Sequence, residues 1–185
     1  YIISGKKNVI KQLLEVNLLP SEADSGVVFK RVDVEGCPTI PASVLCVSDT
    51  SRGTTLSKNG VKVATIEHLL SALVGLNVDN VLVELNGEEI PILDGSPRFW
   101  VEEIKKAGTV ELEKERKYFY LKESVSYVDE KNGIEIVGVP ADDFKVTTLI
   151  DYKTKVLGEQ TARFSENDDY EYELSKCRTF VFLHE

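Results

Sequence analysis

The sequence has no methionine and only two histidines, His68 and His184, in 185 residues. It also lacks an apolar run close to the ~18 residues that a membrane-spanning helix needs. Its first residues do not show the order of basic and apolar regions that marks a signal peptide. The sequence therefore predicts neither a transmembrane helix nor a cleaved leader, and histidine-based sites are limited to two positions.

Cysteine is scarce as well, and acidic residues outnumber basic ones, 31 to 22. The three cysteines, Cys37, Cys46 and Cys177, are odd in number and lack the spacing of a metal motif, which favours buried, reduced thiols and a cytoplasmic location. The net charge is −9, and both halves of the sequence are acidic, which argues against a nucleic-acid binder held by phosphate contacts. A small phosphorylated substrate is compatible with this balance, because a few local lysines or arginines suffice to bind it.

The first part of the sequence carries strand patterns separated by turn signals. Alternating and β-branched stretches predict strands at residues 13–19, 27–32, 39–46 and 80–85. Asn59-Gly60 and Asn86-Gly87 predict tight hairpin turns, and residues 88–93 are expected to return as a strand after the second turn.

Two helices are expected among these strands. Apolar residues recur with helical spacing over residues 65–74, where Thr65 would be the N-cap and Gly75 the C′ stop. Ser96-Pro97 is typical of the start of a second helix, which would end at Gly108. A small sheet covered by two helices predicts an α+β fold, arranged as a two-layer sandwich.

The rest of the sequence resumes strand signals without a long apolar helix to cover them. Strands are expected at residues 118–121, 124–127, 134–137, 144–150, 162–164 and 177–182, with a hairpin turn at Asn132-Gly133 and a short helix within 165–175. A sheet with an uncovered apolar face is unstable alone, and the sequence stops inside an apolar element. We therefore interpret residues 1–110 as an N-terminal domain and residues 111–185 as the truncated start of a second, similar domain.

The pair Glu67-His68 at the start of the first helix is the strongest candidate for chemistry. A hydrolytic zinc site needs a neutral imidazole on the metal and a carboxylate that takes a proton from the bound water. Neighbours on a helix point about 100° apart, so they can flank one water without both being ligands. The alternative is a first-turn glutamate that the helix dipole favours beside an ordinary histidine, and isolated Glu-His pairs are common.

Three further segments allow a functional and a structural interpretation each. The hydroxyls and the arginine of residues 49–54 could meet a polar or phosphorylated ligand, or form a solvated loop. Residues 94–97 could shape a cleft wall, or form a turn that leads into a capped helix. In Arg178-Thr179-Phe180 the threonine hydroxyl could donate to an oxyanion, or the triplet could follow plain strand alternation.

Taken together, these segments resemble a known family. Residues 65–73, then Asn80-Val81, then residues 89–96, in this order and spacing, are similar to the UDP-3-O-acyl-N-acetylglucosamine deacetylases, and Arg178-Thr179-Phe180 matches that family again. The resemblance covers essentially the whole chain. Residues 30–55 are most similar to the Bacteroidetes branch, in which the deacetylase is often fused to a dehydratase.

The resemblance implies a zinc enzyme of lipid A biosynthesis that removes the N-acetyl group from UDP-3-O-(3-hydroxyacyl)-N-acetylglucosamine. It further implies two similar α+β domains with the site between them. By this resemblance His68 binds Zn²⁺, Glu67 activates the zinc-bound water and Thr179 helps to hold the tetrahedral oxyanion. The remaining implied site residues line the sugar and acyl region or border the site: Phe180, Ser51, Arg52 and Gly53.

The sequence also departs from the family. The other two zinc ligands, a His and an Asp four residues apart, and a second catalytic His would lie beyond position 185. A Gly-rich, His-containing loop near the family's N-terminus is replaced by residues 5–11, which contain no histidine. Since one ligand cannot hold catalytic zinc, the competing hypothesis is a non-catalytic domain of this fold that binds a partner or a nucleotide sugar.

Overall fold

The structure is a computed structural model that describes residues 2–6 and 13–181. The chain divides into two compact units, residues 1–114 together with 169–185, and residues 115–168. Helices and strands are both present, which confirms the predicted α+β class. The predicted domain division between residues 110 and 111 stays a prediction.

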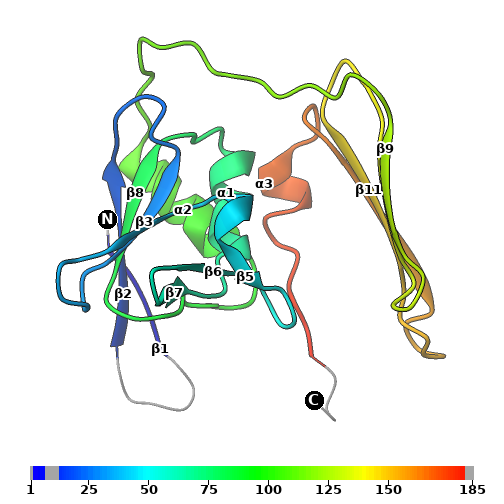
Figure 1. Cartoon of the computed structure of the whole chain (residues 1–185), viewed down its shortest axis with the longest axis horizontal. Coiled ribbons are helices and arrows are strands. Elements are labelled where there is room, and N and C mark those ends of the chain that lie inside the picture. Colours follow the sequence, from blue (N-terminus) through cyan, green and yellow to red (C-terminus); the bar gives the residue numbers. More distant parts are fainter. Residues whose placement is uncertain (1, 7–12, 182–185) are drawn as a thin grey trace. The chain divides into compact units, whose positions relative to one another are not determined.

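A five-stranded sheet forms the framework of the first unit (Figure 1). Its order is β1-β2-β8-β3-β4, and the central strand β8 runs antiparallel to β2 and parallel to β3. Alternate residues of β8 are buried, as expected for a strand with one face on the core. The strands are β1 (Ile2–Lys6), β2 (Leu13–Pro20), β3 (Val27–Arg31), β4 (Thr39–Pro41) and β8 (Val81–Leu85).

A second, three-stranded sheet follows in the same unit. It contains β5 (Val47–Asp49), β6 (Thr55–Lys58) and β7 (Val61–Val63), preceded by the short 3₁₀ helix η1 (Val44–Cys46). The turn between β6 and β7 has φ of 53° at Asn59 and 79° at Gly60. Positive φ at both central residues is what a type I′ turn requires, so the predicted hairpin is confirmed.

The hairpin predicted at Asn86-Gly87 is wrong. Both edges of β8 are already paired, with β2 and with β3, so a returning strand has no hydrogen-bonding edge to join. The chain instead crosses to Ala64, whose N–H donates to the carbonyl of Glu88 (2.8 Å) and whose carbonyl accepts from Ile90 (3.0 Å). This crossing fixes the chain immediately before the first helix.

Two α-helices, α1 (Glu67–Gly75) and α2 (Arg98–Ala107), contact each other and complete the core (Figure 1). Helix α2 ends before Gly108, which has a φ of 78°, as predicted. Pro97 occupies its N-cap rather than N1, one position earlier than expected. The fully buried large side chains come from both sheets, from the connections and from both helices: Val16, Phe29, Ile40, Leu56, Val63, Ile66, Leu69, Leu73, Val83, Leu85, Ile90 and Trp100.

The predicted caps of α1 are wrong. Thr65 has a φ of 60° and its hydroxyl donates to Glu89 (3.1 Å), so it does not cap the helix; Ile66 is the N-cap and makes no side-chain cap bond. Gly75 is the last helical residue, and Asn77, with a φ of 57°, takes the left-handed position after the helix. Asparagine tolerates this conformation through its short polar side chain.

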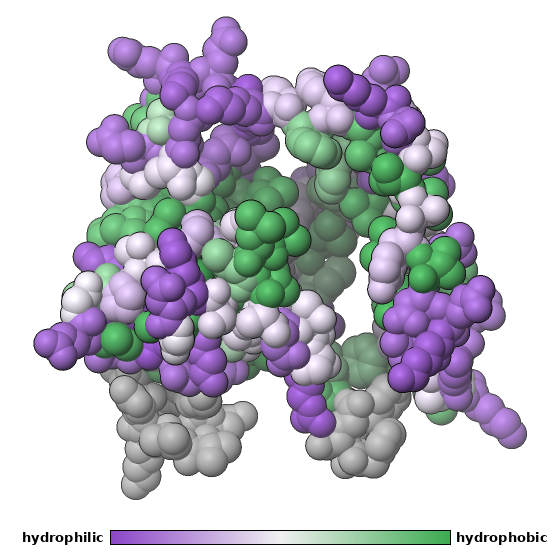
Figure 2. Space-filling model, in the orientation of Figure 1, coloured by the Kyte–Doolittle hydropathy of each residue, from purple (hydrophilic) through white to green (hydrophobic). Residues whose placement is uncertain are grey.

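The second unit consists of two antiparallel hairpins, β9 (Val125–Asp129) with β10 (Ile134–Gly138) and β11 (Lys145–Asp151) with β12 (Glu159–Ser165). The hairpin predicted at Asn132-Gly133 is confirmed, whereas residues 118–121 form no strand. Apolar side chains such as Tyr127, Ile136 and Leu149 are exposed, and Figure 2 shows hydrophobic residues on the surface among hydrophilic ones.

The residues after β12 return to the first unit. A short helix, α3 (Tyr170–Glu173), lies within the expected range. The strand predicted at residues 177–182 is wrong over residues 177–181, which form an extended segment outside any sheet; Phe182 lies outside the described residues. In the part of the chain that the structure describes, no helix is long and apolar enough to cross a bilayer.

Arg31 is a buried cation that joins two strands of the first unit. Its guanidinium donates to both carboxylate oxygens of Asp33 (2.8 and 2.7 Å) and to the carbonyl of Lys62 in β7 (2.7 Å). The hydrogen bond from Arg31 lowers the pKa of Asp33, against an opposing effect of burial. The ion pair therefore stabilises the fold where Asp33 is ionised.

We expect Asp33→Asn to lower the free energy of unfolding at pH 7 by about 1–2 kcal/mol, because Asp33 is partly exposed and solvent screens the pair. The contribution is fully present above the unfolded pKa of ~3.9 and is lost as the pH falls through the lower folded pKa. Urea unfolding should therefore show that the free energies of unfolding of the wild type and of Asp33→Asn differ less at about pH 3 than at pH 7. Glu35→Gln, at an exposed position in the same turn, is the control; an equal loss there would contradict the assignment.

Candidate active site

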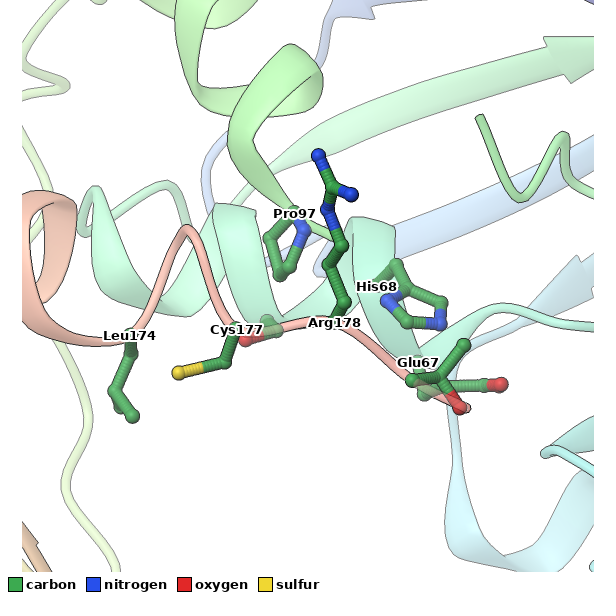
Figure 3. A pocket seen from close by; sticks show the side chains of 8 residues that line it. Glu67, His68, Pro97, Leu174, Cys177 and Arg178 are labelled. Atoms are coloured by element: carbon green, nitrogen blue, oxygen red, sulfur yellow. The ribbon is translucent and has the colours of Figure 1, made fainter. Parts of the chain in front are cut away.

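Glu67 and His68 form the first turn of α1 and face an open pocket (Figure 3). Both are half-buried. The backbone before them is fixed by the bridge at Ala64 and by the positive φ of Thr65. The pocket is lined by residues of α1, of the turn before α2 and of the segment after α3: Glu67, His68, Ser71, Pro97, Leu174, Cys177, Arg178 and Thr179.

The carboxylate of Glu67 is anchored by the loop before β6. Its Oε2 accepts a hydrogen bond from the backbone N–H of Thr54 (2.9 Å). Gly53 allows this approach: a Cβ there would lie 2.9 Å from Oε1 of Glu67, and the φ of 150° also favours glycine. One carboxylate oxygen is thus held by the backbone, and the group is fixed in place at the pocket.

His68 supplies the imidazole that the described residues bring to the pocket. Among residues 2–6 and 13–181, no three His, Cys, Asp or Glu side chains gather as metal ligands. A catalytic zinc takes three protein ligands and keeps one position open. The described residues therefore fit one corner of a zinc site, with an imidazole beside a fixed carboxylate, and do not form the whole site.

The segment with Arg178 and Thr179 is held on the turn before α2. The N–H of Thr179 donates to the carbonyl of Gly95 (2.8 Å), and a Cβ at Gly95 would lie 3.4 Å from Cγ2 of Thr179. Arg178 reaches the carboxylate of Asp94 at 3.4 Å, and Arg98 reaches the same oxygen at 3.5 Å. Pro97 of this turn lines the pocket, so the turn both leads into α2 and carries one side of the pocket.

Asp94 is the charged centre of that turn. Its Oδ1 accepts from the hydroxyl of Ser96 (2.7 Å) and from the N–H of Ser96 (3.1 Å). Burial raises the pKa of Asp94, but the hydrogen bonds from Ser96 and the charges of Arg178 and Arg98 outweigh it and leave the pKa below its usual value. The carboxylate is therefore ionised at neutral pH and pairs with both guanidinium groups.

The structure brings together four of the residues predicted from the sequence: Glu67, His68 and Thr179 line the pocket, and Gly53 lies against Glu67. Ser51 and Arg52 are exposed and do not line it, and the hydroxyl of Ser51 bonds to Asp49 (2.9 Å). Phe180, which follows Thr179 in the sequence, is half-exposed and also lies outside the lining. His184 and residues 7–11 lie outside the described residues. The proposed roles of all these residues stay predictions.

Three lining residues were not predicted as site residues from the sequence. Ser71 follows Glu67 by one helical turn, so the 3.6-residue period places it on the same face, and this spacing could have revealed it. Leu174 and Cys177 come from the segment after α3. No local pattern marks them, because only the long-range return of the chain brings them to the pocket.

Comparison with known proteins gives consistent matches. Residues 8–185 match the family model described as LpxC, UDP-3-O-acyl N-acetylglycosamine deacetylase. The chain is 38% identical to the bifunctional enzyme LpxC/FabZ of Bacteroides thetaiotaomicron over 185 residues, which is 100% of this chain and 40% of that protein. It is 41% identical to the protein of the same name from Porphyromonas gingivalis over 172 residues, 93% of this chain and 37% of the relative.

A single-function relative matches as well. The chain is 38% identical to the UDP-3-O-acyl-N-acetylglucosamine deacetylase of Saccharophagus degradans over 178 residues, which is 94% of this chain and 58% of that protein. The chain therefore spans 37–58% of the length of these three relatives.

Proposed function

This chain belongs to the UDP-3-O-acyl N-acetylglycosamine deacetylase family, and from that membership we propose that the whole protein carrying it is a zinc-dependent deacetylase. Its substrate is UDP-3-O-(3-hydroxyacyl)-N-acetylglucosamine, whose N-acetyl group it hydrolyses to acetate and a free amine in lipid A biosynthesis. The relatives from three organisms carry names with this deacetylase or its LpxC designation, which supports the proposal.

One observation within the structure carries the proposal. A fixed carboxylate, an imidazole and a threonine from a distant segment line one pocket: Glu67, His68 and Thr179. These are the side-chain types that amide hydrolysis needs, namely a base, a metal ligand and a hydroxyl donor. The remaining zinc ligands are proposed to lie outside the residues that the structure describes.

The proposed roles come from the family resemblance, and the place of these side chains at one pocket supports them. When bound, zinc lowers the pKa of a coordinated water toward about 7 and polarises the amide carbonyl. His68 offers a ring nitrogen to the metal. Glu67, with Oε2 held by Thr54, takes the proton of the attacking water on its other oxygen, Oε1. The hydroxyl of Thr179 donates to the oxygen of the acetyl group as negative charge develops there.

The other residues and the architecture complete the proposal. Gly53 keeps the space that the carboxylate of Glu67 occupies. Ser51, Arg52 and Phe180, which lie outside the lining of the pocket, are proposed to contact parts of the nucleotide sugar or acyl chain that extend beyond it. The first unit is proposed to be a two-layer sandwich of its sheet and helices. The expectation that the cysteines are buried is wrong, since two are exposed and one is half-buried, but all three are free thiols, which favours a cytoplasmic enzyme.

The test uses the whole protein, purified with its metal and given UDP-3-O-acyl-N-acetylglucosamine. We expect acetate release, about one zinc per chain, loss of activity with a chelator and recovery with added zinc. Substrate binding without acetate release would favour the non-catalytic nucleotide-sugar domain instead. Acetate release that is indifferent to the chelator would contradict the metal part of the proposal.

A further inference from the structure

One aromatic side chain, Tyr170, attaches helix α3 to α1. The residue is 7% exposed, although it belongs to a four-residue helix at the surface. Its ring lies on the backbone of Gly75, where a Cβ would come within 2.2–2.4 Å of three ring carbons. A side chain at position 75 would displace the ring, so glycine at this position permits the contact.

The Tyr170 hydroxyl adds a directed bond to the same helix. It lies 2.6 Å from Oγ of Ser71, which lines the pocket one turn after Glu67. Burial raises the pKa of Tyr170, against a smaller opposing effect of the bond to Ser71, so the phenol is neutral at physiological pH. By contrast, the ion pair between Lys105 and Glu171 has half-exposed partners, and such pairs contribute little.

A chain of short-range hydrogen bonds runs from Tyr170 toward Thr179. The carbonyl of Tyr170 accepts from Leu174 (3.0 Å) and Ser175 (2.9 Å), and Cys177 donates to Leu174 (2.9 Å). The Ser175 hydroxyl donates to Glu171 (2.6 Å), and Ser175 is 1% exposed. The segment between the two residues is therefore a folded turn rather than a loose tether.

Beyond this turn the segment reaches the turn before α2. Within the described residues it belongs to no sheet, and it is held by the backbone bond from Thr179 to Gly95 and by the ion pair of Arg178 with Asp94. The Arg178 side chain is 63% exposed, so that pair is weak. The firm anchor on the α3 side is Tyr170.

We propose that Tyr170 is a positioning residue that fixes the Thr179 hydroxyl opposite Glu67 and His68 by fastening the segment to the helix that carries them. This inference rests on the proposed deacetylase function. One helix then sets the positions of both sides of the pocket, through its first turn and through its contact with Tyr170. A misplacement of about 1 Å can reduce an enzyme's rate about 10²-fold, so the anchor matters for turnover although it touches no substrate.

The test is Tyr170→Ala in the whole protein, with acetate release as the assay. We expect kcat to fall about 10²-fold with KM nearly unchanged, because the threonine acts in the transition state. In a Thr179→Ala background the same change should lower kcat no more than about twofold, since the group being positioned is already gone. Tyr170→Phe keeps the ring and should give a loss of under about tenfold.

Tyr172 provides the matched control, because it lies in the same helix and is 72% exposed. Tyr172→Ala should leave kcat unchanged. An equal loss in this control, or an undiminished effect of Tyr170→Ala in the Thr179→Ala background, would overturn the inference. If wild-type protein releases no acetate, the proposed function fails instead.

Amide hydrogen exchange tests the anchor without any activity. The N–H of Thr179 is bonded to Gly95, so peptides covering residues 176–181 should exchange faster in Tyr170→Ala and in Tyr170→Phe, and at the wild-type rate in Tyr172→Ala. Protection that is unchanged in both Tyr170 variants would show that the segment is held by other contacts. Tyr170→Phe keeps this measurement available if the alanine variant does not fold.

Discussion

Glu67→Gln in the whole protein is expected to lower deacetylase kcat by about 10²–10⁴-fold, the range that a general base contributes. Glutamine keeps the size of the side chain and an oxygen that accepts from the N–H of Thr54, so the pocket keeps its shape. What it loses is the ability to take a proton at neutral pH. The zinc content should stay at about one per chain, because the base is not a metal ligand in this mechanism.

The measurement is acetate release together with metal analysis on the same sample. Glu88→Gln is the matched control, since Glu88 is exposed and its ion pair with Lys62 has half-exposed partners; such surface pairs contribute little. Unchanged turnover in Glu67→Gln would refute the role of Glu67. Loss of zinc together with turnover would instead show that the carboxylate is a ligand.

The strands and helices in which apolar residues recur with one regular spacing could be predicted from the sequence. Strands β2, β3 and β8 and helices α1 and α2 lie close to their expected ranges, because alternating or helical burial of apolar residues decides each of them locally. Asn59-Gly60 was also predictable, since two residues with positive φ select their own turn type.

The errors arose where long-range contacts decide the outcome. Asn86-Gly87 carries a strong hairpin signal, yet β8 already has a partner on each side, which no local pattern shows. Gly75 resembled a helix stop, whereas Tyr170 packs on it from a distant segment. A glycine required for close approach and a glycine required for its φ look the same in a sequence.

The same distinction applies to the pocket. Glu67-His68 was visible as a pair at a helix start, because both residues come from one turn. Thr179 could be assigned only through the family resemblance, since its approach to the pocket depends on the return of the chain after the second unit. The bond from Thr54 to Glu67 was likewise beyond any pattern, although it is what holds the carboxylate in place.

Thr179 allows its hydroxyl to be tested separately from its packing. Its methyl group Cγ2 faces Gly95, and its N–H donates to the Gly95 carbonyl. Thr179→Val keeps both of these contacts and replaces only the hydroxyl, whereas Thr179→Ser keeps the hydroxyl and removes the methyl group. The two substitutions therefore divide the chemistry of the side chain from its attachment to the turn.

We expect Thr179→Val to lower kcat by about 10²–10³-fold, the loss found when one oxyanion donor is removed, while Thr179→Ser keeps kcat within about tenfold of wild type, the cost of a slightly looser position. KM should change little in both, because a bond made only in the transition state does not contribute to substrate binding. Steady-state acetate release with matched melting temperatures provides the measurement. A valine variant with wild-type kcat, or a serine variant as slow as valine, would show that Thr179 serves packing against Gly95 and would contradict its role as a donor to the oxyanion.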